Sequence, residues 1–301
     1  MVKLAAVTGA TGFVGPHLVA ALARHGWKLR LLVRRWTPLP SLAGVDAEVV
    51  WGDLSNEASL GALVAGADAV VHAAGLIKAR QPAEFDRVNR DGTARLSALA
   101  PDVPFLLLSS LAAREPQLSP YAASKRAAEE AVAARGGRWL VVRAPAVYGP
   151  GDRETLAYFK MAALGFALQP AGPGARLSLI HVEDLGEDLA AALGGTTRSG
   201  VYEVDDGHLD GYSHADMAAA AAIALGRPVR GVRVGQGLMA AVAWLNALRP
   251  GPQILSPAKV RELFHPDWTV SQLRLPCAPV RYGLEEGFRH TILWYRRHHW
   301  L

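Results

Sequence analysis

Short apolar runs alternate with amphipathic stretches through the first half of the chain. Apolar runs typical of buried strands occupy residues 2–7, 29–33, 47–51, 69–72, 105–108 and 140–143, and helical patterns fill most of the stretches between them. The connections are short, and repeated strand–helix alternation of this kind favours a parallel sheet with helices on both faces. We therefore predict an α/β fold with a doubly wound parallel sheet, whose ligand lies at the carboxyl ends of the strands.

The pattern changes after residue 152. Helical patterns occupy residues 155–164, 182–193 and 213–225, the last with Ser213 as a candidate N-cap, and strands are predicted at 177–181 and 201–204. Residues 165–176 are rich in glycine and proline and predict a loop, and the remainder alternates short helices and loops. We predict a main domain of residues 1–151 plus about 177–204, and a smaller, discontinuous C-terminal substrate domain of residues 152–176 plus about 205–301.

The first apolar run leads at once into the segment TGATGFVG, residues 8–15, and then into a helix. Gly9 permits a sharp turn, Gly12 lets the backbone approach a phosphate, and Gly15 lets the helix pack closely on the strand. The helix N-terminus then offers free N–H groups and a partial positive charge to an anion. This context predicts that a dinucleotide binds through its pyrophosphate, so the predicted sheet is Rossmann-like.

The end of the second predicted strand bears on which dinucleotide binds. The residue there faces the adenine ribose, where an acid hydrogen-bonds a free 2′-hydroxyl and an arginine favours a 2′-phosphate. The sequence offers Arg34 and Arg35 and no acid, so we predict NADP(H) as the preferred cofactor and NAD(H) as the alternative. Asp53, after the third strand, is expected to hydrogen-bond the adenine amino group or to cap the helix that starts near Asn56.

Two further polar residues are interpreted as structural. His72 ends the fourth strand, and a lone histidine there is more typical of a packed core than of a catalyst. Asn89 lies in a helical pattern and by itself indicates a surface position.

A serine, a tyrosine and a lysine follow in a spacing that suits hydride transfer. Tyr121 and Lys125 are four residues apart in a predicted helix and therefore share one face, one turn apart. An ammonium beside a tyrosine favours its phenolate, which makes the hydroxyl a better acid or base. Ser110, at the end of the fifth strand, is placed to hydrogen-bond a carbonyl oxygen, so we predict these three as the catalytic residues.

Composition excludes several classes of function. The single cysteine, Cys277, excludes an intramolecular disulfide and a cysteine-based zinc site, and we expect no metal and a reducing, cytoplasmic location. No apolar run reaches the ~20 residues that span a membrane. The net charge of +5 is compatible with a phosphorylated cofactor or an anionic membrane surface. We expect no nucleic acid, because the basic residues are spread along the chain.

The motifs together resemble the short-chain dehydrogenase/reductase superfamily, in its extended, NAD-dependent epimerase/dehydratase-like branch. The resemblance is carried in family order by TGATGFVG at 8–15, GDL at 52–54, HAAG at 72–75, SS at 109–110, YAASK at 121–125, RAPAVYGPGD at 143–152 and HVEDL at 181–185. It implies Ser110, Tyr121 and Lys125 as the catalytic triad and Asn89 as a prop of the active-site region. The cofactor contacts that it implies, with the two arginines discussed above, are Gly9, Thr11, Gly12, Phe13, Val14, Arg34, Arg35, Asp53, Leu54, Ala73, Ala74, Tyr121, Lys125, Pro145, Ala146 and Val147.

Two departures from sugar epimerases point towards reduction. Ser110 and Tyr121 are only eleven residues apart, which resembles the atypical branch with the complex I accessory subunit and bacterial ceramide-type reductases. Arg34 stands where NAD-using epimerases carry an acid. The second half of the chain, where the substrate domain is predicted, is also rich in apolar stretches, whereas sugar sites need several polar side chains.

We therefore expect an NADPH-dependent oxidoreductase that reduces a ketone on a hydrophobic, lipid-like substrate. Two alternatives stay open: a nucleotide-sugar epimerase or dehydratase, and an NADPH-holding structural subunit of a membrane complex. The C-terminal stretch of residues 293–301 mixes aromatic and basic residues, which is compatible with peripheral contact at the inner face of a membrane or with a helix docked on the core. A homodimer is a further expectation of the resemblance.

Overall fold

The fold was analysed in a computed structural model of the chain, which describes residues 2–34, 45–170, 172, 174–247, 256–270, 273–276 and 278–301. The chain divides into two compact units. Unit 1 comprises Met1–Ala144, Leu185–Glu203 and Gln272–Ala278, and unit 2 comprises Pro145–Asp184, Val204–Ser271 and Pro279–Leu301. Both units are discontinuous in the chain.

Unit 1 is built on a parallel sheet, which has seven strands within the described residues, in the order β11-β6-β5-β4-β1-β2-β3. Their bounds are β1 Leu4–Thr8, β2 Lys28–Val33, β3 Ala47–Trp51, β4 Ala69–His72, β5 Phe105–Ser110, β6 Trp139–Ala144 and β11 Gly200–Glu203. The order runs outwards in both directions from the β1–β4 pair, so the carboxyl ends of β1 and β4 lie at a topological switch point. The predicted doubly wound sheet is confirmed.

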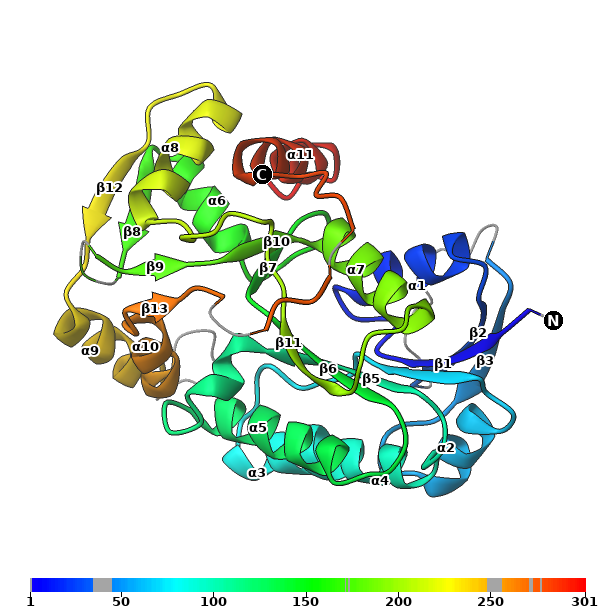
Figure 1. The fold of residues 1–301 in the computed structure, drawn as a ribbon. Helices are drawn as coiled ribbons and strands as arrows, with labels where there is room; N and C mark the ends of the chain where they lie inside the picture. The colour runs from blue at the N-terminus through cyan, green and yellow to red at the C-terminus, as the bar shows by residue number, and fades with distance from the viewer. Residues whose placement is uncertain are drawn as a thin grey trace. The chain divides into compact units, whose positions relative to one another are not determined.

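Helices cover both faces of this sheet (Figure 1). α1 (Gly15–Arg24) and α7 (Val182–Gly194) lie on one face, and α2 (Glu57–Val64), α4 (Gly92–Ala98) and α5 (Pro120–Ala133) lie on the other. Gly186 of α7 packs directly against the backbone of His17 in α1, since a Cβ at Gly186 would be 3.1 Å from the His17 carbonyl oxygen. A short helix α3 (Pro82–Phe85) and a π-helical turn η1 (Asp86–Asp91) lead into α4, and a 3₁₀ turn η2 (Leu111–Arg114) follows β5.

Unit 2 holds small two-stranded sheets and a helical core. Its strands are β7 Ala146–Tyr148, β8 Phe166–Gln169, β9 Arg176–Leu177, β10 Leu179–His181, β12 Arg230–Arg233 and β13 Asp267–Trp268. Its helices are α6 Leu156–Ala163, α8 His214–Leu225, α9 Gln236–Ala247, α10 Pro257–Leu263 and α11 Leu284–Arg297. α8 begins with the predicted cap, because Ser213 accepts a hydrogen bond from the Asp216 N–H. Phe159, Phe288, Ile292 and Tyr295 form the buried centre of this unit.

Three local predictions in unit 2 are wrong. Residues 166–169 form strand β8 where a loop was expected, because they pair with β12, more than sixty residues further on. Strands β12 and β13 lie in the part expected to hold only helices and loops. The strand expected at 177–181 is broken at Ser178, so that β9 pairs with β13 and β10 pairs with β7. Pairing across such sequence distances leaves no local periodicity to read.

Among the described residues, no helix has the length and apolar character needed to cross a bilayer. That part of the chain also holds no group of three or more histidine, cysteine, aspartate or glutamate side chains placed to bind a metal ion.

Candidate active site

The loop between β1 and α1 requires glycine at two positions. Gly9 has a φ of +83°, and a Cβ on it would lie 2.6 Å from both the carbonyl carbon of Ala73 and the nitrogen of Ala74. A Cβ on Gly15 would lie 2.2 Å from the Gly9 carbonyl oxygen. Gly12 is different, because it is exposed and a Cβ there would meet only the Gly9 oxygen, at 3.4 Å. Gly12 is therefore not required by packing within the protein, and its role in the approach of a phosphate stays a prediction.

The start of α1 fits an anion. Its N-cap residue, Val14, offers no side-chain cap, and its first turn contains no acidic residue. The N–H groups of this turn therefore have no side-chain oxygen as a cap, while the helix dipole favours negative charge beside them. Thr11, Phe13 and Val14 are partly exposed on the same loop. These features fit the pyrophosphate of a dinucleotide, as the sequence predicts.

Replacing Gly15 with alanine is expected to lower the free energy of unfolding by about 1–3 kcal/mol, because the added methyl group is forced against backbone atoms. The matched control is Gly61→Ala in the interior of α2, where a Cβ meets nothing within 4 Å. Alanine there is expected to stabilise by about 0.5–1 kcal/mol. Urea denaturation measures both, and equal effects of the two substitutions would refute the close packing of α1 on the loop.

The predicted adenine side of the site lies at the ends of β2 and β3. Arg34 follows β2 and is exposed, and Asp53 is exposed two residues after β3. The side chain and the N–H of Ser55 donate hydrogen bonds to Asp53 and lower the pKa of its carboxyl group, with a smaller contribution from the charge of Arg34. Asn56, not Asp53, caps α2, since its side chain accepts from the Ser59 N–H. Arg35 lies outside the described residues.

A chain of hydrogen bonds runs inward from the glycine loop through His72. The Ala74 N–H donates to Thr8 Oγ1 at 3.2 Å, Thr8 Oγ1 lies 2.6 Å from His72 Nδ1, and His72 Nε2 lies 2.9 Å from Thr93 Oγ1. Because the Thr93 hydroxyl donates to the Asn89 carbonyl oxygen, it accepts from His72. The proton of the neutral imidazole is thereby assigned to Nε2, and Nδ1 accepts from Thr8. His72 is a fully buried structural residue, as predicted.

The burial of His72 predicts a pH dependence of stability. Burial, aided by the charge of Lys125, lowers the pKa of His72 from 6.5 to about 3. As the pH falls, the unfolded chain takes up a proton at His72 before the folded protein does. The stability that the neutral, buried imidazole contributes is therefore complete above pH 6.5 and is lost as the pH falls towards 3. Between pH 7 and pH 5 it amounts to about 2 kcal/mol. The measurement is the free energy of unfolding in urea at several pH values. Between pH 7 and pH 5 it should fall less for His72→Gln than for the wild type, and an equal fall in both proteins would contradict the prediction.

Asn89 ties the segment after β4 to the helix that carries the predicted catalytic residues. Its Oδ1 accepts from the Leu76 N–H at 2.7 Å, and its Nδ2 donates to the Leu76 carbonyl oxygen at 3.0 Å and to Ser124 Oγ at 2.9 Å. Ser124 in turn donates to the Tyr121 carbonyl oxygen. The surface position expected from the helical pattern is wrong, because Asn89 lies in the π-helical turn and is buried. A π turn shifts the helical phase, so a 3.6-residue period misplaces the side chain.

Lys125 is held in place by the neighbouring strand. α5 begins at Pro120, capped by Ser119, whose Oγ accepts from the Ala122 N–H. One turn into the helix, the buried Lys125 ammonium donates to the Leu108 carbonyl oxygen of β5 at 2.7 Å. Burial lowers the pKa of Lys125 to about 8, although the charge of Glu129 opposes the shift. The ammonium therefore stays largely charged at neutral pH.

Ser110 and Tyr121 lie on two neighbouring elements of unit 1, the strand β5 and the helix α5. Ser110 is the last residue of β5, is partly exposed, and accepts a hydrogen bond from the Ala112 N–H at 3.2 Å. Its own proton can be donated to another acceptor. Tyr121 is partly exposed on α5, with its ring edge-to-face against Phe85 at 6.0 Å. Together with Lys125 they are the residues that the sequence predicts for acid–base chemistry on a carbonyl group, and that role stays a prediction.

Sequence reasoning missed the charged residues that support this arrangement. Glu129, one turn beyond Lys125, accepts from Ser109 Oγ at 2.6 Å and from Arg143 through two hydrogen bonds of 2.9 and 2.7 Å. Arg143 also pairs with Glu203 at 3.6 Å. These side chains are buried, and they tie α5 to the ends of β5, β6 and β11. The spacing of four between Lys125 and Glu129 was the available signal.

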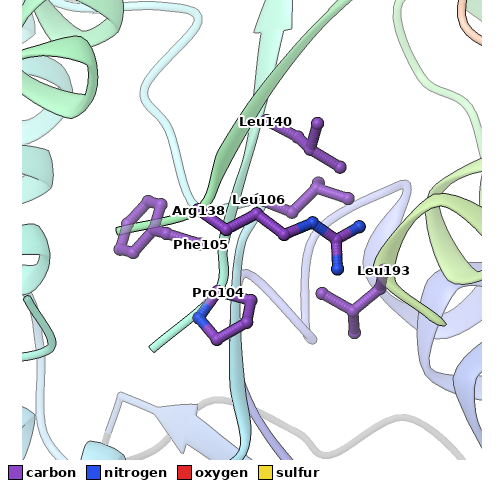
Figure 2. A pocket seen from close by; sticks show the side chains of 6 residues that line it. All are labelled: Pro104, Phe105, Leu106, Arg138, Leu140 and Leu193. Carbon is purple, nitrogen blue, oxygen red and sulfur yellow. The ribbon is translucent and has the colours of Figure 1, made fainter. Parts of the chain in front are cut away.

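A small void lies at the other end of β5 and β6, remote from Ser110. Figure 2 shows it between the strands and α7, lined by Pro104, Phe105, Leu106, Arg138, Leu140 and Leu193. It is far too small for a dinucleotide, and it belongs to the packing of the sheet.

The remaining predicted contacts divide between the units. Ala73 and Ala74 follow β4 beside the glycine loop in unit 1, and Leu54 lies partly exposed after β3. Pro145, Ala146 and Val147 open unit 2, the last two in β7. Their contact with a nicotinamide stays a prediction.

Comparison with known proteins agrees with the fold. Residues 5–204 match the family described as the NAD dependent epimerase/dehydratase family. The chain is 45% identical to a ceramide reductase of Caulobacter vibrioides over 98% of this chain and 95% of the relative. Two solved structures share the fold over at least 98% of both chains: gox2253, at 22% identity and a TM-score of 0.78, and MoeE5 in complex with UDP-glucuronic acid and NAD, at 24% and 0.73.

Proposed function

The chain belongs to the NAD-dependent epimerase/dehydratase family as an NAD(P)-dependent oxidoreductase, and we propose that it is an NADPH-dependent reductase of a ketone on a ceramide-type lipid. The observation that carries the proposal is the identity with a ceramide reductase along nearly the whole length of both chains. Ser110 at the end of β5 and Tyr121 and Lys125 one turn apart on α5 support the proposal. A purely structural subunit has no need of such a set.

Each of the three residues has a defined task in the proposed reaction. NADPH, when bound, supplies the hydride that reduces the carbonyl carbon. Ser110 donates a hydrogen bond to the carbonyl oxygen and stabilises the charge that develops there. Tyr121 donates its hydroxyl proton to that oxygen, which completes the alcohol. Lys125, whose ammonium is fixed by the Leu108 carbonyl oxygen, supplies positive charge one turn from Tyr121 and stabilises the phenolate that remains.

The cofactor residues support NADPH as the preferred reductant. Arg34 is exposed at the end of β2, where an arginine favours a 2′-phosphate. Gly9, Gly12 and Gly15 form the loop that fits the pyrophosphate, and Asp53 with Leu54 would contact the adenine. NAD(H) is the alternative cofactor.

Nucleotide-sugar epimerisation is the second candidate. The structures with NAD and sugar nucleotides match this chain below 25% identity, so they support the fold alone. Arg34 and the apolar character of unit 2 favour reduction of a lipid over a sugar. We also propose that the protein acts in the cytoplasm at the inner face of a membrane, and that it forms a homodimer.

Steady-state assays with two substrates separate these candidates. With NADPH and a ketone-bearing ceramide in mixed micelles, we expect a loss of NADPH absorbance that matches the lipid alcohol formed. With NAD⁺ and UDP-glucose, we expect no change of sugar configuration. Interconversion of the sugar with no NADPH consumed on the lipid would overturn the proposal.

A further inference from the structure

Helix α9 of unit 2 exposes large apolar side chains on its outer face. Leu238, Trp244 and Leu245 are each more than half exposed, and Val242 is exposed as well. Leu238, Val242 and Leu245 are spaced by four and three residues, so they share one face of the helix. The helix Gln236–Ala247 contains no charged residue. A surface helix of this kind departs from the usual pattern of a charged outer face.

The opposite face of α9 is anchored to the unit. Met239 and Ala243 are buried with Val260 of α10, and Val234, Leu263 and Phe264 pack against them. In Figure 1, α9 and α10 lie side by side, and β12 leads into α9. The inner face of α9 is therefore fully packed, and this packing holds the outer apolar face in a fixed position. The exposed side chains of the outer face are not core residues that have lost their contacts.

Basic residues predominate in the segments before and after α9. Between residues 227 and 263 the sequence carries one acidic residue, Glu262, against six basic ones, Arg227, Arg230, Arg233, Arg249, Lys259 and Arg261. Glu262 is buried and pairs with Lys259 at 2.9 Å, so it adds no negative charge at the surface. Arg230 and Arg233 are exposed on β12, immediately before α9, and Lys259 and Arg261 are exposed on α10. Exposed apolar area with a basic rim is complementary to anionic lipid headgroups above acyl chains.

We propose that the α9 face, defined as Leu238, Val242, Trp244 and Leu245, inserts into the interface of an anionic membrane, with the arginines of β12 and the basic residues of α10 on the headgroups. Tryptophan is typical of this interface, because its ring is apolar and its N–H is polar. Lipids with two long chains reside in bilayers. The reason for membrane binding, access to a lipid substrate, rests on the proposed function. The support for it comes from the exposed apolar residues of α9 and the basic residues near them in the sequence.

The aromatic C-terminus, which the sequence offered for this role, is used differently. The ring of Tyr295 in α11 is fully buried, and Trp294 and Trp300 pack against the core of unit 2. Arg296 and Arg297 remain exposed at the end of the helix. The docked helix was the other expectation for residues 293–301, and the structure has it.

Sedimentation with vesicles tests the proposal without NADPH or a lipid ketone. The full chain should bind vesicles of one-third phosphatidylglycerol in phosphatidylcholine, and binding should weaken with added salt. The double variant Leu238→Ser/Leu245→Ser should bind roughly tenfold or more weakly, and Arg230→Glu/Arg233→Glu should lose the preference for anionic vesicles. The matched control is Ile223→Ser, which removes an equally exposed apolar side chain from α8.

Trp244 provides a second measurement that does not depend on the folding of a double variant. Brominated lipids should quench the fluorescence of the wild-type protein more than that of Trp244→Phe. Binding that is absent at low salt, or equal in the wild type and the double variant, would overturn the proposal. The proposal would also be overturned if the double variant abolished a dimer while vesicle binding persisted. The α9 face would then be the contact surface with a second copy of the chain. NADPH binding is measured in parallel on the same proteins. A protein that binds NADPH but not vesicles would contradict the membrane proposal and leave the proposed function intact.

Discussion

Replacing Tyr121 with phenylalanine is expected to lower kcat by about 10²–10⁴-fold, with NADPH affinity nearly unchanged. The substitution removes one oxygen, and with it the proposed proton donor, but keeps the ring that packs on Phe85. The Asn89 and Ser124 hydrogen bonds reach only the backbone of residue 121, so the helix should keep its place. Turnover of a lipid ketone by wild type and variant at saturating NADPH is the measurement.

Tyr202→Phe is the matched control for Tyr121. Tyr202 is buried in β11, and its hydroxyl donates to the Arg198 carbonyl oxygen at 2.9 Å. Losing it should cost about 1 kcal/mol of stability and leave kcat unchanged. If Tyr121→Phe turned over at the wild-type rate, the catalytic assignment would be wrong.

Replacing Arg34 with aspartate is expected to weaken NADPH binding by roughly 100-fold and NADH binding by only a few-fold. The guanidinium would lose its contact with the 2′-phosphate, and the new carboxylate would repel it. NADH, with a free 2′-hydroxyl, carries no charge at this place. Titration of both cofactors, followed by quenching of tryptophan fluorescence, gives the ratio of the two dissociation constants.

Lys28→Asp makes the same charge change at the other end of the same strand. Lys28 is the first residue of β2 and pairs with Asp46 at 3.2 Å on the surface. The Lys28→Asp substitution should leave the ratio of the NADPH and NADH dissociation constants as it is in the wild type. An unaltered ratio in Arg34→Asp would show that the arginine does not meet the 2′-phosphate, and NAD(H) would then become the better cofactor assignment.

The parts of the site that depend on local spacing could be predicted from the sequence. Gly9 and Gly15 are needed because neighbouring backbone leaves no room for a Cβ, and such needs are written into a short motif. Tyr121 and Lys125 share a helix face through a spacing of four, which any regular helix produces. The parallel sheet with helices on both faces follows from repeated strand–helix alternation with short connections.

The parts that depend on distant partners could not be predicted. The carboxylate of Glu129 is held by Ser109 and Arg143, residues on other elements, and its spacing of four from Lys125 does not reveal these partners. β8 has its partner in β12, so its residues resemble a loop when considered alone. The inward position of Asn89 depends on one irregular turn of helix, which a regular period cannot represent.

The most direct test of the account is the fate of the hydride. NADPH deuterated at the transferable position is incubated with the enzyme and a ketone-bearing ceramide, and the lipid product is examined by mass spectrometry. We expect one deuterium on the carbon that bears the new hydroxyl group, with one NADP⁺ formed for each alcohol. A lipid that stays unreduced, while the enzyme interconverts a sugar nucleotide with a cofactor that it never releases, would contradict the account.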